Sequence, residues 1–369
     1  MKIRLSQAQS GIALIIVLIV MVVLGILAIG FATSMKVEIT LARHASFGSD
    51  LDWAGRGGVE VSKWIIAEST KGPNAQFDSL KQKWAGGPGE TNANVIDALA
   101  GIDPKNFQTT DADGLPFGTL SIEIIDLERK FNVNVADEMI LKQAMTLIGV
   151  DAAQASTITG SILDWRDRDS STHMSGAESE YYEGLEIPYF AKDGPVDDLT
   201  ELLLVKGVTP AMYWGSGGGG LPAVLNRPPG GLKGAFDEPT YALGMVNLFT
   251  PISGRLININ TASAEVFQLF PYIDANIAHM IISGSPQSRA GPDGADGTYD
   301  DQPFRNVQEL QRVGLPPQLV QQMAPYCSVK SLCFEARISV DLRGVRREYV
   351  APLRRNGPKD IQTLNLHWK

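Results

Sequence analysis

The stretch that decides the fold is IALIIVLIVMVVLGILAIGFA, residues 12–32, in which no side chain is charged. A helix rises about 1.5 Å per residue, so such a run spans roughly 30 Å, the thickness of a bilayer core. The residues before it include Lys2 and Arg4 and no acid. Because basic flanks stay cytoplasmic, we expect a single-pass protein of the cell inner membrane whose C-terminal part lies in the periplasm.

Three interpretations of this N-terminus compete. A secretory signal peptide has an apolar core of about 7–15 residues before a small-residue cleavage site. Gly30-Phe31-Ala32 offers such a site, but the core before it is too long. A plain signal anchor is the second interpretation. The third is a prepilin leader, residues 1–11, that is cleaved between Gly11 and Ile12 and leaves the apolar helix on the mature protein. Ile16 stands where prepilins usually carry glutamate.

The helical pattern continues beyond the membrane segment. Apolar residues recur at mainly helical spacing through charged surroundings, and no proline interrupts the chain before Pro73. This pattern predicts one helix from Ile12 to about Glu68, half in lipid and half packed on a soluble domain. The alternative is two helices, broken near Gly48 or Gly57.

Strand patterns lie near both ends of the soluble part, with helical sequence between them. Residues 118–127, 334–341 and 345–353 read as strands, and 342–344 reads as the hairpin turn that joins the last two. We therefore predict an α+β fold: a long N-terminal helix on a pilin-like antiparallel sheet, with a large inserted α-helical domain. The expected layout is a leader at 1–11, a transmembrane helix at 12–32, an αβ domain built from 33–128 and 327–369, and an inserted α-domain at 129–326 with repeats at about 131–214 and 255–326.

The inserted region contains an internal repeat whose copies start at FNVN, residues 131–134, and ININ, residues 257–260. Each copy resembles a helix-hairpin-helix module, in which a glycine-rich turn presents backbone N–H groups to a phosphate. Asp151 and Asp274 replace the second glycine of that turn. A carboxylate there repels phosphate. The net charge of −9 and the pI of 5.1 also argue against a nucleic-acid partner.

The whole pattern resembles the K-subunit minor pseudopilin family of type II secretion systems. The resemblance covers nearly the whole chain. It rests on the Gly11-Ile12 junction without glutamate at the fifth mature position, on the paired helical units, and on Asp164-Trp165, Ala177-Glu178, Tyr181-Tyr182, Pro188-Tyr189, Glu201-Leu202 and Val205-Lys206-Gly207.

The resemblance implies a structural protein at the tip of the pseudopilus that supports protein export across the outer membrane. It implies processing by prepilin peptidase, a ternary complex with the I and J minor pseudopilins, contact with the major pseudopilin, and calcium in the α-domain. Two alternative functions are also compatible with a membrane anchor. One is a helix-hairpin-helix DNA-uptake protein, and the other is a minor pilin of a type IV pilus.

The missing glutamate has a physical interpretation. A charged side chain at the centre of a bilayer costs about 2.5–3.5 kcal/mol unless it is paired. In pilin-like assemblies its partner is the N-terminal amine of a neighbouring subunit. A subunit at the filament tip has no neighbour above it, so the apolar Ile16 avoids an unpaired charge. The simpler interpretation is that Ile16 only faces lipid in a plain anchor.

Two acidic loops are candidate calcium sites, because calcium prefers several hard oxygen ligands. The first loop has acidic or hydroxyl residues at positions 1, 3, 5 and 12 of a calcium loop, but Thr172 replaces the glycine expected at position 6. Either loop is alternatively a solvated polar turn. The candidate ligands are Asp167, Asp169, Ser171, Glu178 and Glu180 in the first loop, and Asp293, Asp296 and Asp300 in the second.

The two cysteines, Cys327 and Cys333, are six positions apart. In the periplasm such a pair predicts one disulfide, which would join the α-domain to the sheet; in the cytosol both would be free thiols. The sequence shows no catalytic constellation: the four histidines are scattered, and there is no His-Glu-x-x-His, no Walker A loop and no Gly-x-Ser-x-Gly elbow. A periplasmic enzyme on a signal anchor is therefore disfavoured, and we predict no enzymatic activity.

Mass spectrometry of the mature N-terminus, from membranes of the native host, tests the processing prediction. We expect a chain that begins at Ile12 and carries an N-methyl group. A chain that begins at Met1 or Thr33 would instead identify a plain anchored or a secreted protein.

Overall fold

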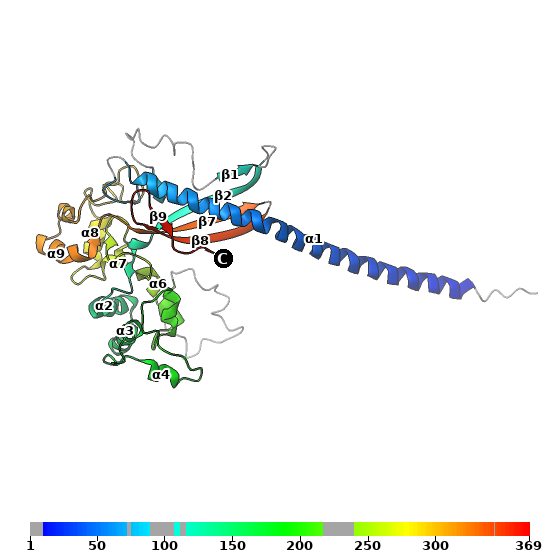
Figure 1. Cartoon of the computed structure of the whole chain (residues 1–369), viewed down its shortest axis with the longest axis horizontal. Coiled ribbons are helices and arrows are strands. Elements are labelled where there is room, and N and C mark those ends of the chain that lie inside the picture. Colours follow the sequence, from blue (N-terminus) through cyan, green and yellow to red (C-terminus); the bar gives the residue numbers. More distant parts are fainter. Residues whose placement is uncertain (1–9, 72–74, 89–106, 111–115, 217–239, 343) are drawn as a thin grey trace, which may run out of the picture.

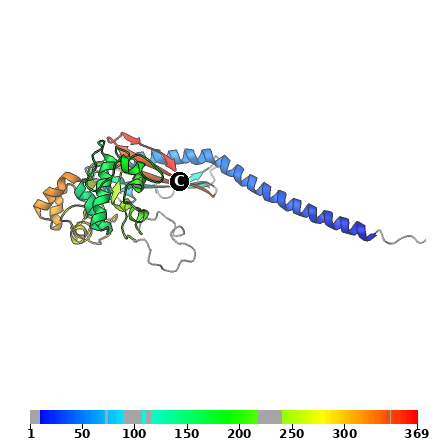
Figure 2. The same cartoon turned by 90° about the horizontal axis from the view of Figure 1, so that it is seen from below.

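The structure is a computed structural model that describes residues 10–71, 75–88, 107–110, 116–216, 240–342 and 344–369. A single long helix projects from a body that contains a sheet and a helical part (Figures 1 and 2). The predicted leader, residues 1–11, lies outside the described residues except for its last two positions. Gly11 and Ile12 belong to the first turn of the long helix.

Helix α1 runs from Ser10 to Ser69 without interruption, as predicted, and is not broken at either glycine site. Its segment Leu14–Ile39 has a mean hydropathy of 3.3 and is not buried anywhere in the structure. That segment is long and apolar enough to cross a membrane, and Figure 1 shows it extending away from the body. These features fit a single-pass membrane anchor.

The C-terminal half of α1 packs on one face of the sheet. Leu51, Ile65 and Ile66 are fully buried there. Two glycines allow the close approach: a methyl group at Gly55 would lie 2.6 Å from the Tyr349 ring, and one at Gly58 would lie 2.6 Å from Ile338 Cγ2. The glycines therefore serve helix–sheet packing and do not end the helix.

The sheet is antiparallel and contains the three predicted strands. The strand order is β1-β2-β7-β8-β10, and β9 also pairs with β8. Side chains on β7 alternate between buried and half-buried, as expected for a sheet that is covered on one face by α1. Pairing of Asp126 with Phe334 brings the two ends of the insertion side by side. The strands are β1 Phe107–Thr110, β2 Pro116–Asp126, β7 Cys333–Leu342, β8 Val345–Arg355, β9 Ile361–Thr363 and β10 His367–Trp368.

The region between β2 and β7 forms a second body with its own hydrophobic core, which extends from Phe131 to Cys327. Its elements are short and are joined by long turns. They are β3 Phe131–Asn132, α2 Glu138–Ile148, α3 Ala152–Arg166, α4 Ser179–Glu183, η3 Leu199–Leu204, α5 Pro210–Trp214, α6 Met245–Leu248, β4 Phe249–Thr250, β5 Ile257–Asn258, α7 Ala264–Phe267, α8 Ala275–Ile282, η4 Val307–Val313, α9 Pro317–Met323, η5 Ala324–Tyr326 and β6 Cys327–Ser328. The α-domain limits of 129 and 326 remain a prediction.

The two copies of the repeat use matching asparagines. The side chain of Asn134 accepts from the N–H of Val196 and donates to its carbonyl, at 2.7 and 2.9 Å. In the same way, the side chain of Asn260 accepts from the N–H of Phe304 at 2.8 Å and donates to its carbonyl at 2.9 Å. Each copy also contains a short pair of parallel strands, β3 with β4 in the first copy and β5 with β6 in the second. The sequence repeat thus corresponds to a repeated hydrogen-bond pattern.

The likeness to helix-hairpin-helix modules stays a prediction, but the two aspartates now have a role. Asp151 Oδ1 accepts from the N–H groups of Ala153 and Gln154, both at 3.1 Å, at the start of α3. Asp274 Oδ1 accepts from Ile277 N–H at 2.8 Å, at the start of α8. These carboxylates therefore occupy the N–H groups to which a phosphate would bind.

A buried polar junction joins the two bodies. The Asn258 side chain from the α-domain donates to the Asp78 carbonyl at 3.0 Å and to Asp126 Oδ2, at the end of β2, at 3.2 Å. Arg355, at the end of β8, forms an ion pair with the Asp78 carboxylate and also donates to the Ser331 carbonyl. All five of these residues are at most 3% exposed. We expect the junction to hold the α-domain in one orientation on the sheet.

Arg355→Ala tests this junction because it leaves Asp78 buried and unpaired. We expect a loss of about 3–5 kcal/mol in the free energy of unfolding, measured by denaturant titration of the detergent-solubilised chain. Arg354→Ala is the matched control, because its side chain is exposed, and should change stability by at most about 0.5 kcal/mol. Equal stability of the two variants would contradict this role.

Candidate metal centre beside helix α4

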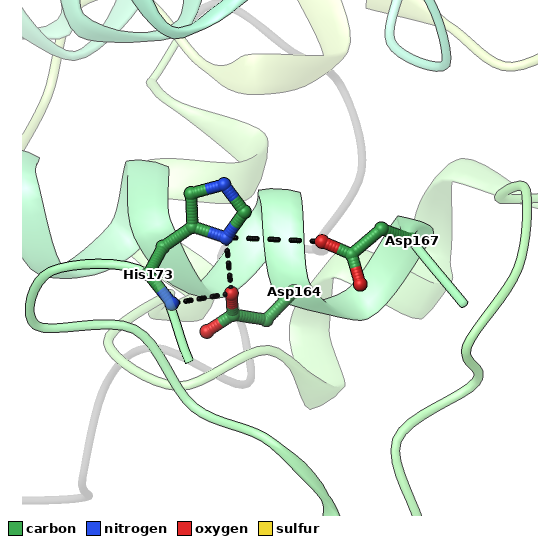
Figure 3. Close-up of side chains that lie close together, drawn as sticks. All are labelled: Asp164, Asp167 and His173. Atoms are coloured by element: carbon green, nitrogen blue, oxygen red, sulfur yellow. Dashed lines mark hydrogen bonds and ion pairs between the residues drawn. The ribbon is translucent and has the colours of Figure 1, made fainter. Parts of the chain in front are cut away.

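Four acidic side chains converge between the end of α3 and the start of α4. Asp164 lies in the last turn of α3, Asp167 is the residue that ends it, and Glu178 directly precedes α4. Ligand atoms of Asp167, Asp169 and Glu178 lie within 4.8 Å of one another. Asp164, Asp167 and His173 form a second group with the same spacing (Figure 3).

His173 folds back onto the end of α3. Asp164 Oδ1 accepts from the backbone N–H of His173 at 2.9 Å and lies 2.5 Å from its Nδ1 (Figure 3). The same ring nitrogen is 3.7 Å from Asp167 Oδ2. The loop between Asp167 and His173 is therefore closed by contacts to two acidic residues.

Three carboxylate oxygens of the cluster are buried without a hydrogen-bond partner among the described residues: Asp164 Oδ2, Asp167 Oδ1 and Glu178 Oε1. Burial, together with the nearby carboxylates of Asp164 and Asp167, raises the pKa of Glu178 to about 7. Burial and the charges of Asp169 and Asp164 also raise the pKa of Asp167. Mutually repelling carboxylates at a helix C-terminus, with buried oxygens that accept no hydrogen bond, are the arrangement that a bound cation stabilises.

The half-buried Arg166 is turned away from the cluster. Arg166 is next to Asp167 in sequence, but its guanidinium donates to the carbonyl oxygens of Val133 and Ala136. In the second repeat Arg289 makes the equivalent pair of bonds, to the carbonyls of Ile259 and Ala262. Arg166 is therefore used to hold a turn of the repeat. With Arg166 engaged elsewhere, this oxygen-rich site suits a hard divalent ion such as calcium.

The structure brings together three of the five residues predicted for the first loop. Asp167, Asp169 and Glu178 belong to the cluster. Ser171 is exposed and contributes its backbone N–H to Asp169 Oδ1 at 2.8 Å, and Glu180 lies exposed in the first turn of α4. Sequence reasoning missed Asp164 and His173 as parts of this site. Only the fold-back of the loop places them there, although Asp164 was already noted in the family resemblance.

The second acidic loop uses its carboxylates internally. Asp296 forms an ion pair with the buried Arg289, with Nη2 to Oδ2 at 2.6 Å. Asp300 accepts from the N–H of Asp293 at 2.9 Å and from the Thr298 hydroxyl at 2.7 Å. Among the described residues, Asp293, Asp296 and Asp300 do not form a group of three close ligand atoms. Calcium at this loop remains a prediction that these contacts do not favour.

Cys327 and Cys333 are both buried, and in this structure both are free thiols. Burial raises the pKa of both, to about 12 for Cys333. They lie at the start of β6 and of β7, where the chain passes from the α-domain back to the sheet. The disulfide is not formed here and stays a prediction for the oxidised protein.

A long apolar helix that continues onto an antiparallel sheet, with a helical insertion, is the pilin-like fold expected from the sequence. A solved structure shares this fold: the crystal structure of the GspK-GspI-GspJ complex from the enterotoxigenic Escherichia coli type 2 secretion system contains a chain with a TM-score of 0.61 and 17% identity, covering 89% of this chain and 99% of that chain.

Sequence comparisons indicate the same family. Residues 121–214 match the family model described as type II secretion system (T2SS), protein K. Type II secretion system protein K of Aeromonas hydrophila is 28% identical over 216 residues, 56% of this chain and 61% of that protein. The protein of the same name from Pectobacterium carotovorum subsp. carotovorum is 23% identical over 311 residues, 76% of this chain and 86% of the relative. The chain is similar to type II secretion system protein K, in agreement with the sequence resemblance.

The metal cluster predicts a specific pH dependence of stability. The pKa of Glu178 is about 7 when folded, against 4.5 normally. Its contribution to stability is therefore present below about pH 4.5 and is lost as the pH rises through 7. We expect the melting temperature of the metal-free protein to fall between about pH 5 and pH 8, and calcium to restore it most strongly at pH 8.

Glu178→Gln should remove most of the calcium-induced rise in melting temperature. Glu180→Gln is the matched control: it lies two residues along the chain but outside the cluster, so it should keep the rise. If Glu178→Gln responds to calcium as the native protein does, the cluster is not the binding site.

Proposed function

We propose that this chain is a minor pseudopilin, a structural subunit at the tip of a type II secretion pseudopilus that supports protein export across the outer membrane. The observation that carries this proposal is the protein K match over residues 121–214, in a chain whose apolar helix α1 continues onto the sheet. The role is mechanical and requires no catalysis. It consists of presenting a large α-domain on a membrane-anchored helix.

The partners that fit this role are the I and J minor pseudopilins. The solved chain with the same fold was crystallised in a GspK-GspI-GspJ complex. We propose that this chain forms the equivalent complex, that the major pseudopilin continues the filament below it, and that nucleic acid is not a partner. The apolar Ile16 in α1 and the bulky α-domain both suit a terminal position, where no further subunit adds.

The membrane topology and processing follow from the same role. We propose that prepilin peptidase cleaves between Gly11 and Ile12 on the cytoplasmic side and that the new N-terminus is methylated. The first part of helix α1, as far as Ile39, then remains in the inner membrane. The residues after Ile39 lie in the periplasm, where Cys327 and Cys333 can be oxidised.

We propose that calcium binds in the first acidic loop. Asp164, Asp167, Asp169 and Glu178 are the residues that would hold it, and the ion would neutralise carboxylates that otherwise repel one another. Because Glu178 is the residue before α4, its ligation would fix the start of that helix. Calcium at the second loop would require Asp296 to leave Arg289, so the first loop is the stronger candidate.

Co-purification with the I and J pseudopilins of the same host tests the proposed function. We expect a single ternary species by size-exclusion chromatography with light scattering when the three chains are co-expressed. The matched control replaces this chain with the major pseudopilin, which should not enter the ternary species. If I and J pair with each other while this chain elutes alone, the proposal fails.

A further inference from the structure

The segment from α4 to η3 carries an unusual number of exposed apolar side chains. Tyr181, Ile187, Phe190 and Leu204 are 42, 80, 71 and 48% exposed. We call these four residues the α4 patch. Large apolar side chains that gather in one place on a soluble surface mark interaction sites more often than scattered ones do.

Less exposed residues next to the patch connect the chain segments that carry it. The Tyr182 ring packs on the rings of Tyr181 and Tyr189, with centroids 5.2 Å apart in both cases. The Tyr189 hydroxyl donates to the Leu204 carbonyl at 2.7 Å. Next to Phe190, the N–H of Ala191 donates to the Ser179 hydroxyl at 3.0 Å. The patch therefore stands on a fixed base.

Acidic side chains accompany the patch. Glu180, Glu183 and Glu186 are exposed, and none of them forms an ion pair with another described residue. The nearby Lys206 is already engaged, since its ammonium donates to the Gly176 carbonyl at 3.0 Å and stands 4.6 Å from the Tyr181 ring centroid. Lys192 pairs with Asp197 and Glu201. The surface around the patch is thus apolar, and it carries three exposed carboxylates that form no ion pair with a described residue.

The position of the patch leaves it open to a partner. In Figure 1, α4 lies at the edge of the α-domain away from both α1 and the sheet. A pilin-like subunit packs into its filament through the long helix, so packing through α1 does not cover this edge.

We propose that the α4 patch is a docking surface for a protein segment that combines lysine or arginine with large apolar side chains. The exposed side chains of Ile187 and Phe190 supply apolar contact area. The carboxylates of Glu183 and Glu186 select a cationic partner and exclude an acidic one. This proposal concerns a surface of the chain itself and stands independently of the I and J complex.

The test uses the full-length chain in an uncharged maltoside detergent with calcium in excess. The probe is a trifluoromethyl-labelled pentapeptide amide, Lys-Leu-Lys-Leu-Lys, followed by fluorine NMR with empty micelles as background. We expect saturable binding that weakens with salt, and much weaker binding of Glu-Leu-Glu-Leu-Glu and Lys-Ser-Lys-Ser-Lys.

Two double variants separate the two contributions. Ile187→Ser with Phe190→Ser should weaken binding about tenfold, because the apolar contact is lost. Glu183→Gln with Glu186→Gln should weaken it several-fold and remove most of the salt dependence. All four side chains are exposed, so an unchanged melting temperature will show that folding is intact.

Tyr272→Ser and Trp368→Ser are the matched controls, since these aromatic side chains are 79 and 61% exposed elsewhere on the surface. Both should bind the probe as the native chain does. The proposal is overturned if the Ile187 and Phe190 variant binds with native affinity, or if Lys-Ser-Lys-Ser-Lys binds equally well. It is also overturned if sedimentation shows that the native chain is a dimer and the Ile187 and Phe190 variant is a monomer, because a second copy of this chain would then cover the patch.

Discussion

The arrangement of the molecule depends on one buried carboxylate, that of Asp126 at the end of β2. Its Oδ2 accepts from Thr261 and Ser331, both at 2.6 Å, and from the Asn258 amide at 3.2 Å. Burial raises the pKa of Asp126, and it raises that of the neighbouring Glu128 to about 8. All three donors are far from β2 in the sequence. The orientation of the α-domain on the sheet is therefore set by directional hydrogen bonds, whose loss would leave a buried polar group unsatisfied.

This junction connects the membrane-anchored half of the molecule to its distal surfaces. Helix α1 is fixed to the sheet by Gly55 and Gly58, and the sheet is fixed to the α-domain by Asp126 and Asp78. The metal cluster and the α4 patch then lie on a body whose position relative to the membrane helix is defined. Such a connection would transmit movement of helix α1 to the acidic cluster and to the α4 patch.

The sequence predicted most of the architecture because its strongest signals are local. A charge-free run, the absence of proline before Pro73 and the alternation in 334–341 each determine an element without knowledge of the rest. The candidate metal site was predicted only in part, because Asp164 and His173 join it through a fold-back that no spacing rule describes. The second acidic loop shows the converse. Asp296 looked like a ligand, but Arg289, which lies only 7 positions before it in the sequence, pairs with it. The buried Asp78–Arg355 pair joins residues 277 positions apart and left no local signal.

The central claim is that the junction makes the sheet and the α-domain one cooperative unit. Amide hydrogen exchange of the full-length protein, followed by mass spectrometry at increasing denaturant, tests it most directly. The account predicts that peptides from β2, β7 and β8 lose protection at the same denaturant concentration as peptides from α2 and α3. Earlier loss of protection in α2 and α3, with the sheet still protected, would show that the α-domain unfolds independently and would contradict the account.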